Sequence, residues 1–299
     1  VVAAVAPQWV PHPEVWLLVG GLVGLYAYAA RVIGPKVVPA GVPSVTRSQW
    51  RWFGGGIVLL WVAADWPVHD IGEQHLYLVH MAQHTVLTLL IPPMLLMATP
   101  EWLARLVLGR GRVDHWVHTL ARPIPAAIAF NALALLSHWQ VVVNTASQNG
   151  LFHYGMHTAI VVSAFLLWIP VCGPLPELRI SMPAQMLYLF VTSIVPTVPG
   201  AWLVFAEGAV YSVYDIPDRL WGVSVTSDQQ VAGAIMKLGA GTYLWVIIAV
   251  LFFTWASRHA AAEQVPSVRA AGGTLTWDQV QAELDRLPPG PEEARPSIE

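Results

Sequence analysis

Seven stretches of the chain are apolar over lengths that suit a membrane crossing, and polar or turn-forming stretches separate them. A hydrocarbon core about 30 Å thick takes roughly 20 helical residues to cross. We place the seven helices near 15–33, 51–66, 76–98, 124–143, 151–170, 184–206 and 229–256. The pattern predicts an all-α, polytopic membrane bundle of seven transmembrane helices.

Three of the predicted helices contain glycines or prolines that affect their packing or their shape. The second stretch is short and carries three consecutive glycines at 54–56, so we expect it to pack closely on its neighbours. The third stretch contains two consecutive prolines, Pro92 and Pro93, and the sixth contains Pro196 and Pro199. Proline lacks the backbone N–H that a helix needs, so both helices are predicted to kink.

The basic residues alternate between connections, which predicts an orientation. Lys and Arg favour the cytoplasmic side of a membrane. They occupy the first, third and fifth connections and the start of the tail, at Arg31, Lys36, Arg47, Arg51, Arg105, Arg110, Arg112, Arg122, Arg179 and Arg258. We therefore expect the N-terminus outside and the C-terminus in the cytoplasm.

Composition agrees with a chain that contacts membrane lipid. Of the 299 residues 56% are hydrophobic and 11% charged, and the mean hydropathy is +0.55. No basic run suggests nucleic acid. The single cysteine, Cys172, excludes an intramolecular disulfide and cysteine-rich metal sites.

The composition changes near the end of the last hydrophobic stretch. We expect a transmembrane domain over 1–258 and a mostly flexible cytoplasmic tail over 259–299. Within the tail, Thr276 and Gln279 resemble a capping box, and apolar residues recur at helical spacing behind them. This predicts a short amphipathic helix near 277–287.

Two pairs of histidines share the spacing i, i+4. His80 and His84 stand near the start of the third helix, and His153 and His157 near the start of the fifth. Residues at this spacing share one helix face. In the predicted orientation both helices begin at the outer side, and His138 reaches the same layer from the end of the fourth helix. Five histidines are therefore expected near one outer layer.

Ionisable side chains inside a membrane usually face the bundle interior and mark function. Imidazole is the commonest metal ligand in proteins, and thioether sulfur favours Cu(I). A single histidine or methionine is more often a structural residue, but two matched pairs favour a metal site. The candidate ligands are His80, His84, His138, His153, His157, Met81 and Met236, with Gln83, Asp228 and Gln229 expected to orient the imidazoles. Asp228 also suits a helix N-terminus.

The strings HLYLVHMAQHTVLTLLIPPMLLMATPEWL, SHWQVVVNTASQNGLFHYGMH and SDQQVAGAIMKLGAG resemble the bacterial CtaG family of cytochrome c oxidase assembly factors, over roughly residues 50–258. The motifs HMxQH, the later histidine pair and DQxxxG of that family fall on His80, Met81, Gln83, His84, His153, His157, Asp228, Gln229 and Gly233. Many members have an aromatic residue directly after the methionine of the last motif, which is Met236 in this chain. This chain has Lys237 there, so the resemblance implies no role for that position.

The resemblance implies a seven-helix protein of the bacterial plasma membrane that is not an enzyme and supplies copper to the catalytic subunit of a haem-copper oxidase. Oxidase subunits and a copper chaperone are the implied partners. An unrelated single-span copper chaperone with cysteine ligands shares the family's name, and one cysteine excludes that protein.

Two alternatives stay open from the sequence. Histidines from two helices can also ligate haem in a membrane electron carrier. Two histidines at i, i+4 on each helix, however, place all four imidazoles around one site and leave little separation for two stacked haems. A copper transporter would need ligating groups that continue across the membrane, whereas the third helix becomes mainly apolar beyond Thr88.

Overall fold

The computed structural model describes residues 9–217, 219–270 and 277–285 and divides into two compact units, Val1–Leu251 and Phe252–Glu299. The described residues form helices and turns, and no strand occurs among them. The predicted all-α class is therefore confirmed.

The α-helices are α1 (Pro13–Tyr28), α2 (Gly34–Val37), α3 (Arg47–Ala64), α4 (Val68–Gln74), α5 (Tyr77–Thr85), α6 (Ile91–Ala98), α7 (Glu101–Leu108), α8 (Arg112–Leu120), α9 (Pro123–Ser137), α10 (Gln140–Gln148), α11 (Gly150–Cys172), α12 (Met182–Ile194), α13 (Thr197–Val204), α14 (Val225–Ala234), α15 (Ala240–Ala270) and α16 (Trp277–Leu284). The π-helical segments η1 (Ala29–Ile33), η2 (Val86–Leu90) and η6 (Ile235–Gly239) join α1 to α2, α5 to α6 and α14 to α15. Short 3-10 turns lie at η3 (Pro176–Leu178), η4 (Ser212–Tyr214) and η5 (Leu220–Gly222).

Five helices of the described chain are long and apolar enough to cross a membrane, namely Pro13–Val37, Tyr77–Ala98, Gly150–Cys172, Met182–Val204 and Val225–Ala260. They correspond to the first, third, fifth, sixth and seventh expected spans. The fourth expected span, 124–143, begins in α9. This helix reaches the length of a membrane span only when it is joined to α8, and the two helices are bent by 81°. The second corresponds to α3, whose N-terminal half is polar or glycine-rich. The total of seven spans and the orientation stay predictions.

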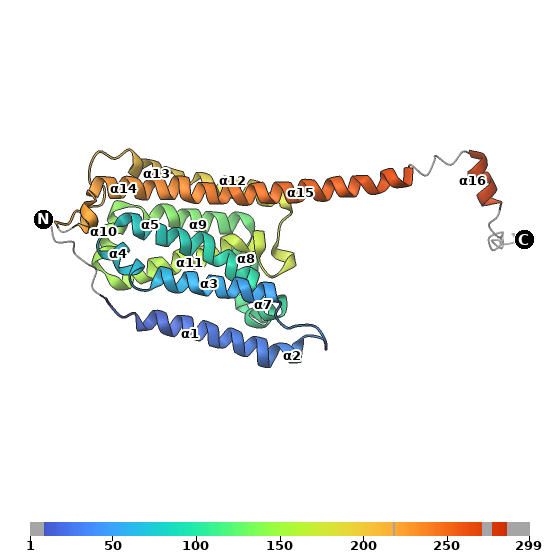
Figure 1. Cartoon of the computed structure of the whole chain (residues 1–299), viewed down its shortest axis with the longest axis horizontal. Coiled ribbons are helices and arrows are strands. Elements are labelled where there is room, and N and C mark those ends of the chain that lie inside the picture. Colours follow the sequence, from blue (N-terminus) through green and yellow to red (C-terminus); the bar gives the residue numbers. More distant parts are fainter. Residues whose placement is uncertain (1–8, 218, 271–276, 286–299) are drawn as a thin grey trace, which may run out of the picture. The chain divides into compact units, whose positions relative to one another are not determined.

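Within the unit Val1–Leu251, α6 packs against α3 and α11. Helix α11 also packs against α9 (Figure 1). The largest apolar core lies among these helices, α12 and the start of α15, and centres on the fully buried Leu167, Trp168 and Leu189. Two of the three consecutive glycines face α6 closely, since a Cβ at Gly55 would lie 2.6 Å from the Met94 side chain and a Cβ at Gly56 2.8 Å from the Leu95 side chain.

The prolines act in two different ways. Pro92 has no N–H to pair with the Thr88 carbonyl, and the chain passes through the π-helical η2 immediately before it. Trp168 Nε1 donates to that carbonyl at 3.0 Å, which satisfies the group that the proline leaves free. In the sixth span Pro196 lies at the break between α12 and α13.

The unit Phe252–Glu299 contains the C-terminal part of α15 and the short helix α16. The helix α16 covers positions 277–284 of the amphipathic helix expected near 277–287. Residues 286 and 287 lie outside the described part of the chain, and the division into a membrane domain and a tail stays a prediction.

Candidate metal centre

The structure brings the two histidine pairs together, one from α5 and one from α11. The ring centroids of His84 and His157 lie 4.4 Å apart, those of His80 and His84 4.5 Å apart, and those of His153 and His157 4.2 Å apart. Spacing of i, i+4 explains the contact within each pair. The contact between the pairs is a result of helix packing.

The ring nitrogens of this cluster approach at distances that suit metal ligands. His84 Nε2 and His157 Nε2 lie 3.2 Å apart. Two ligands about 2.0–2.1 Å from one tetrahedral ion lie about 3.3 Å from each other. Candidate ligand atoms of His80, His84 and His157 all lie within 4.8 Å of one another, and so do those of Glu73, His153 and His157. The donor set therefore fits a metal ion.

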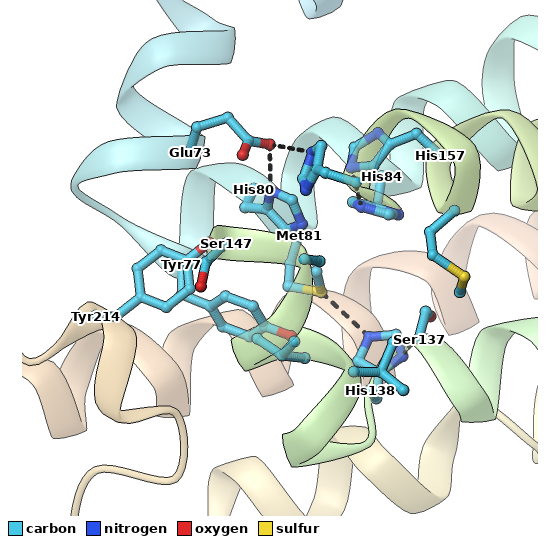
Figure 2. Close-up of a pocket in the computed structure, with 15 residues that line it drawn as sticks. Glu73, Tyr77, His80, Met81, His84, Ser137, His138, Ser147, His157 and Tyr214 are labelled. Carbon is cyan, nitrogen blue, oxygen red and sulfur yellow. Dashed lines mark hydrogen bonds and ion pairs between the residues drawn. The ribbon is translucent and has the colours of Figure 1, made fainter. Parts of the chain in front are cut away.

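Glu73, at the end of α4, joins the cluster. Its Oε1 lies 2.7 Å from His153 Nε2 and 3.3 Å from His80 Nδ1 (Figure 2). All three atoms are buried, and none has a partner with hydrogen-bond geometry among the described residues. A carboxylate and two imidazoles thus converge without being satisfied as hydrogen-bonding groups. We name Glu73, His80, His84, His153 and His157 the histidine–glutamate cluster.

Burial raises the pKa of Glu73, but its contacts with His153 and His80 outweigh that effect and hold the pKa well below its ordinary value. The carboxylate therefore stays ionised at neutral pH. Its negative charge stands beside the imidazoles of His80, His153 and His157 and favours a cation there.

His138 belongs to neither of those groups of ligand atoms, and its ring contacts Met81. His138 Nδ1 is 2.6 Å from the Ala134 carbonyl, and its Nε2 is 3.3 Å from Met81 Sδ (Figure 2). Met236 is buried, and together with Met81 and His138 it lines a second cavity of about 70 Å³. Its neighbour Lys237 is exposed.

Asp228 stabilises the helix that carries the first histidine pair. The carboxylate accepts hydrogen bonds from the backbone N–H groups of Tyr77 at 3.0 Å and Leu78 at 2.8 Å, where α5 begins. The first N–H groups of a helix have no partner within it, and a negative charge at that end is favourable. Arg219 Nη2 donates to the same carboxylate at 2.7 Å and balances its charge.

Gln229 holds the segment before η4. Its Oε1 accepts from the N–H groups of Val210 at 2.8 Å and Tyr211 at 3.3 Å, and its Nε2 donates to the Tyr211 carbonyl at 3.1 Å. The Tyr211 hydroxyl then donates to the His138 carbonyl at 2.8 Å. This places Gln229 two contacts away from the His138 backbone.

Gln83 donates to the Ala63 carbonyl at 2.7 Å and lies 3.3 Å from His69 Nδ1. Among the hydrogen bonds of the described residues, none joins Gln83, Asp228 or Gln229 to a ring of the two histidine pairs. The three residues support helices and loops around the cluster.

A family model described as "Cytochrome c oxidase caa3 assembly factor (Caa3_CtaG)" matches residues 24–258, which include every residue of the cluster. The chain belongs to the Caa3_CtaG family. Searches of curated proteins and of solved structures found no match. The resemblance noted from the motifs is confirmed, and with its apolar helices this Caa3_CtaG chain is a membrane protein of an oxidase assembly family.

The DQxxxG motif of this Caa3_CtaG chain combines three structural tasks on α14. Asp228 stabilises the start of α5, and Gln229 holds the segment before η4. At Gly233 a Cβ would lie 2.5 Å from the Gly200 carbonyl oxygen, so only glycine lets α13 and α14 approach this closely.

Sequence reasoning missed Glu73 as a member of the cluster. It stands seven residues before His80, but His75 and Leu76 interrupt the helix between them, so no helical spacing connects the two. A usable signal was present, because Glu73 is an acidic residue in the connection that precedes the helix with the HMxQH motif, and that connection is predicted to face outward.

Proposed function

We propose that this Caa3_CtaG chain is an assembly factor of the bacterial plasma membrane that binds copper at the histidine–glutamate cluster. It helps to insert that copper into the catalytic subunit of a haem-copper oxidase and performs no catalysis of its own. The observation that carries the proposal is the convergence of Glu73 Oε1, His153 Nε2 and His80 Nδ1, all buried and all without hydrogen-bond geometry.

Leaving buried polar atoms unsatisfied costs about 1–3 kcal/mol for each group. A bound cation removes that cost, because the lone pairs of the carboxylate and imidazoles then point at a positive charge. Imidazole nitrogen suits copper, zinc and iron. Copper is the metal that an assembly role at a haem-copper oxidase requires.

The dimensions of the site favour an ion over haem. The cavity beside the cluster has a volume of about 40 Å³, room for water or an ion but far below the size of a porphyrin. The histidine rings also stand in mutual contact, with centroids as close as 4.2 Å. A haem between the two pairs would need the helices to separate.

The same geometry favours delivery on one side over transport through the membrane. Beyond Thr88 the third span packs into the apolar core at Leu89 and Leu96, against Phe130 and Leu167. A transport path would need polar or ligating groups to continue through this layer. Copper would therefore enter from a chaperone and leave to the oxidase at the same end of the bundle.

The test compares detergent-purified wild type with His80→Ala, His153→Ala and the control His259→Ala, which alters an exposed histidine outside the cluster. Elemental analysis and an absorption spectrum are measured on each. We expect copper in wild type and His259→Ala and its loss in both cluster variants. A Soret band would make the chain a haem protein, and absence of metal from every sample would reject a metal site.

A second readout is the copper content of the oxidase in cells. Cells that express His80→Ala or His153→Ala at the wild-type level should assemble oxidase with less copper, whereas His259→Ala should restore the wild-type content. Oxidase with full copper content in the cluster variants would contradict the proposed role.

A further inference from the structure

The proton of His138 can be assigned from its contacts. Nδ1 lies 2.6 Å from the Ala134 carbonyl oxygen, and a carbonyl can only accept. Ser137 Oγ, 3.2 Å from the same nitrogen, donates to that carbonyl at 2.9 Å. The proton therefore sits on Nδ1, and Nε2 carries a lone pair.

That lone pair points at another atom without a hydrogen. His138 Nε2 lies 3.3 Å from Met81 Sδ, and both side chains are buried, with 8% and 3% of their residue surface exposed. A thioether can only accept. A second proton on the ring would satisfy the contact, but no carboxylate of the described residues contacts His138 to balance the charge.

A metal-binding histidine commonly donates its other ring N–H to a backbone carbonyl, which fixes the tautomer and the ring orientation. His138 already has this arrangement through Ala134. The lone pair of the imidazole suits copper among other metals, and the soft thioether sulfur beside it selects Cu(I).

We propose that His138 Nε2 and Met81 Sδ form a second metal subsite, selective for Cu(I) and distinct from the histidine–glutamate cluster. The identity of the metal as cargo rests on the proposed function above. Met236, which lines the same cavity, is the candidate third ligand. We name these three residues the thioether subsite.

The two sites are connected through shared cavity walls. Met81, His84 and His138 line both the cavity beside the cluster and the cavity that holds Met236. The imidazole of His84 and the sulfur of Met81 therefore border the same two cavities. Two π-helical segments line the second cavity. Thr88 and Leu89 of η2 contribute to its wall, and so does Met236 of η6. Such segments often occur at functional sites.

The experiment uses the full chain in detergent under anaerobic conditions. Cu(I), supplied as its bicinchoninate complex, and redox-inert Ag(I) are titrated into wild type, Met81→Leu, His138→Gln and the control Met94→Leu, whose methionine lies in α6 outside both cavities. Zn(II) is titrated in parallel as a probe of the cluster.

We expect Met81→Leu and His138→Gln to bind Cu(I) and Ag(I) at least tenfold more weakly than wild type, with Zn(II) affinity unchanged. Sulfur scattering in the X-ray absorption spectrum of the Cu(I)-loaded protein should decrease in Met81→Leu and stay at the wild-type level in Met94→Leu. Cu(I) and Ag(I) affinities equal to those of wild type in Met81→Leu would overturn the thioether subsite.

The double variant His80→Ala/His153→Ala separates this inference from the proposed function. If the double variant still binds Ag(I) and the triple variant with Met81→Leu does not, the result supports the thioether subsite. This holds even if the double variant has lost the copper of the cluster. Copper lost on altering the cluster, with no effect of Met81→Leu, leaves the proposed function standing and rejects the subsite. Absence of Cu(I) and Ag(I) from wild type rejects both.

Discussion

Glu73 is the residue whose chemistry differs most from its surroundings in the cluster, because it alone supplies a negative charge. Its contacts with His80 and His153 join α4 to the two histidine-bearing helices. The lowered pKa keeps the carboxylate ionised across the neutral range. In the proposed site Glu73 would therefore contribute both a ligand atom and charge balance for a bound cation.

Replacing Glu73 by glutamine keeps the shape and removes the charge. We expect Glu73→Gln to weaken metal binding at the cluster by about tenfold or more, with little change in folding. Isothermal titration with Zn(II) or Cu(II) measures the affinity. Glu101→Gln is the matched control, because Glu101 is exposed and pairs with Arg105. Equal affinities in Glu73→Gln and wild type would remove Glu73 from the site.

At this scale the sequence predicted that the two histidine pairs lie close together but not which other side chains they contact. The spacing of His80 and His84 sufficed to put them on one face. Nothing in that spacing indicated that His138 pairs with Met81 through a ring nitrogen whose tautomer Ala134 sets. Such contacts depend on rotamers and on distances between helices, which a single sequence does not contain.

At the scale of helices, the contact between α13 and α14 depends on Gly233. A Cβ there would meet the Gly200 oxygen at 2.5 Å, the Leu203 Cβ at 2.8 Å and the Val204 nitrogen at 3.0 Å. Two of these three atoms belong to backbone and cannot move aside as a side chain can.

We expect Gly233→Ala to lower the free energy of unfolding by about 1–3 kcal/mol, since α13 and α14 must separate to make room. The control is Gly241→Ala in α15, where a Cβ meets nothing within 4 Å. That change should leave stability equal or slightly higher. Unfolding temperatures in detergent measure both. A Gly233→Ala protein as stable as Gly241→Ala would show that the helices are not in close contact.

The start of α1 is joined to α4 through His12. Its Nε2 lies 2.9 Å from Asp70 Oδ2, and its Nδ1 lies 3.1 Å from Glu14 Oε1. Burial lowers the pKa of His12, but these carboxylates outweigh it and raise the pKa above the ordinary value of 6.5. The folded state therefore binds the proton more tightly than the unfolded state.

The stabilisation from His12 is complete below pH 6.5 and is lost as the pH rises through the raised pKa. We expect wild type to exceed His12→Gln in unfolding temperature near pH 5.5 and to lose this advantage by about pH 9. Paired thermal unfolding curves over that range test it. A difference that stays constant with pH would mean that the His12 charge does not contribute.

Hydrophobic length predicted five of the helices well, and proline predicted the break at Pro196. The sequence did not predict the π-helical η2 before Pro92 or the hydrogen bond from Trp168 that satisfies Thr88. Trp168 is 80 residues away in sequence and reaches Thr88 only because α11 packs against this span. The local sequence pattern identifies the helices, whereas packing between helices decides which side chain satisfies a backbone group that a helix leaves without a hydrogen bond.

For the molecule as a whole, orientation in the membrane decides which compartment reaches the histidine–glutamate cluster. The charge pattern predicts that the α10–α11 end faces outward and the α7–α8 end faces the cytoplasm. Under the proposed function, this would put the cluster on the side where copper is received and delivered.

The single cysteine makes the orientation easy to test. In a Cys172→Ser background, Gln148→Cys and Arg110→Cys introduce exposed thiols at the two ends of the bundle. A membrane-impermeant maleimide should label the Gln148→Cys protein in intact cells and the Arg110→Cys protein only after lysis. The opposite pattern would invert the topology, and labelling of both in intact cells would contradict a membrane-spanning arrangement.

The placement of one histidine pair on each of two helices has a mechanical consequence. An ion shared by His84 and His157 would tie α5 to α11 at a point where the two rings now meet across 3.2 Å. The end of the bundle that carries the cluster would then be stiffer when loaded than when empty, and the spacing of the two helices would report the presence of cargo to any protein that docks there.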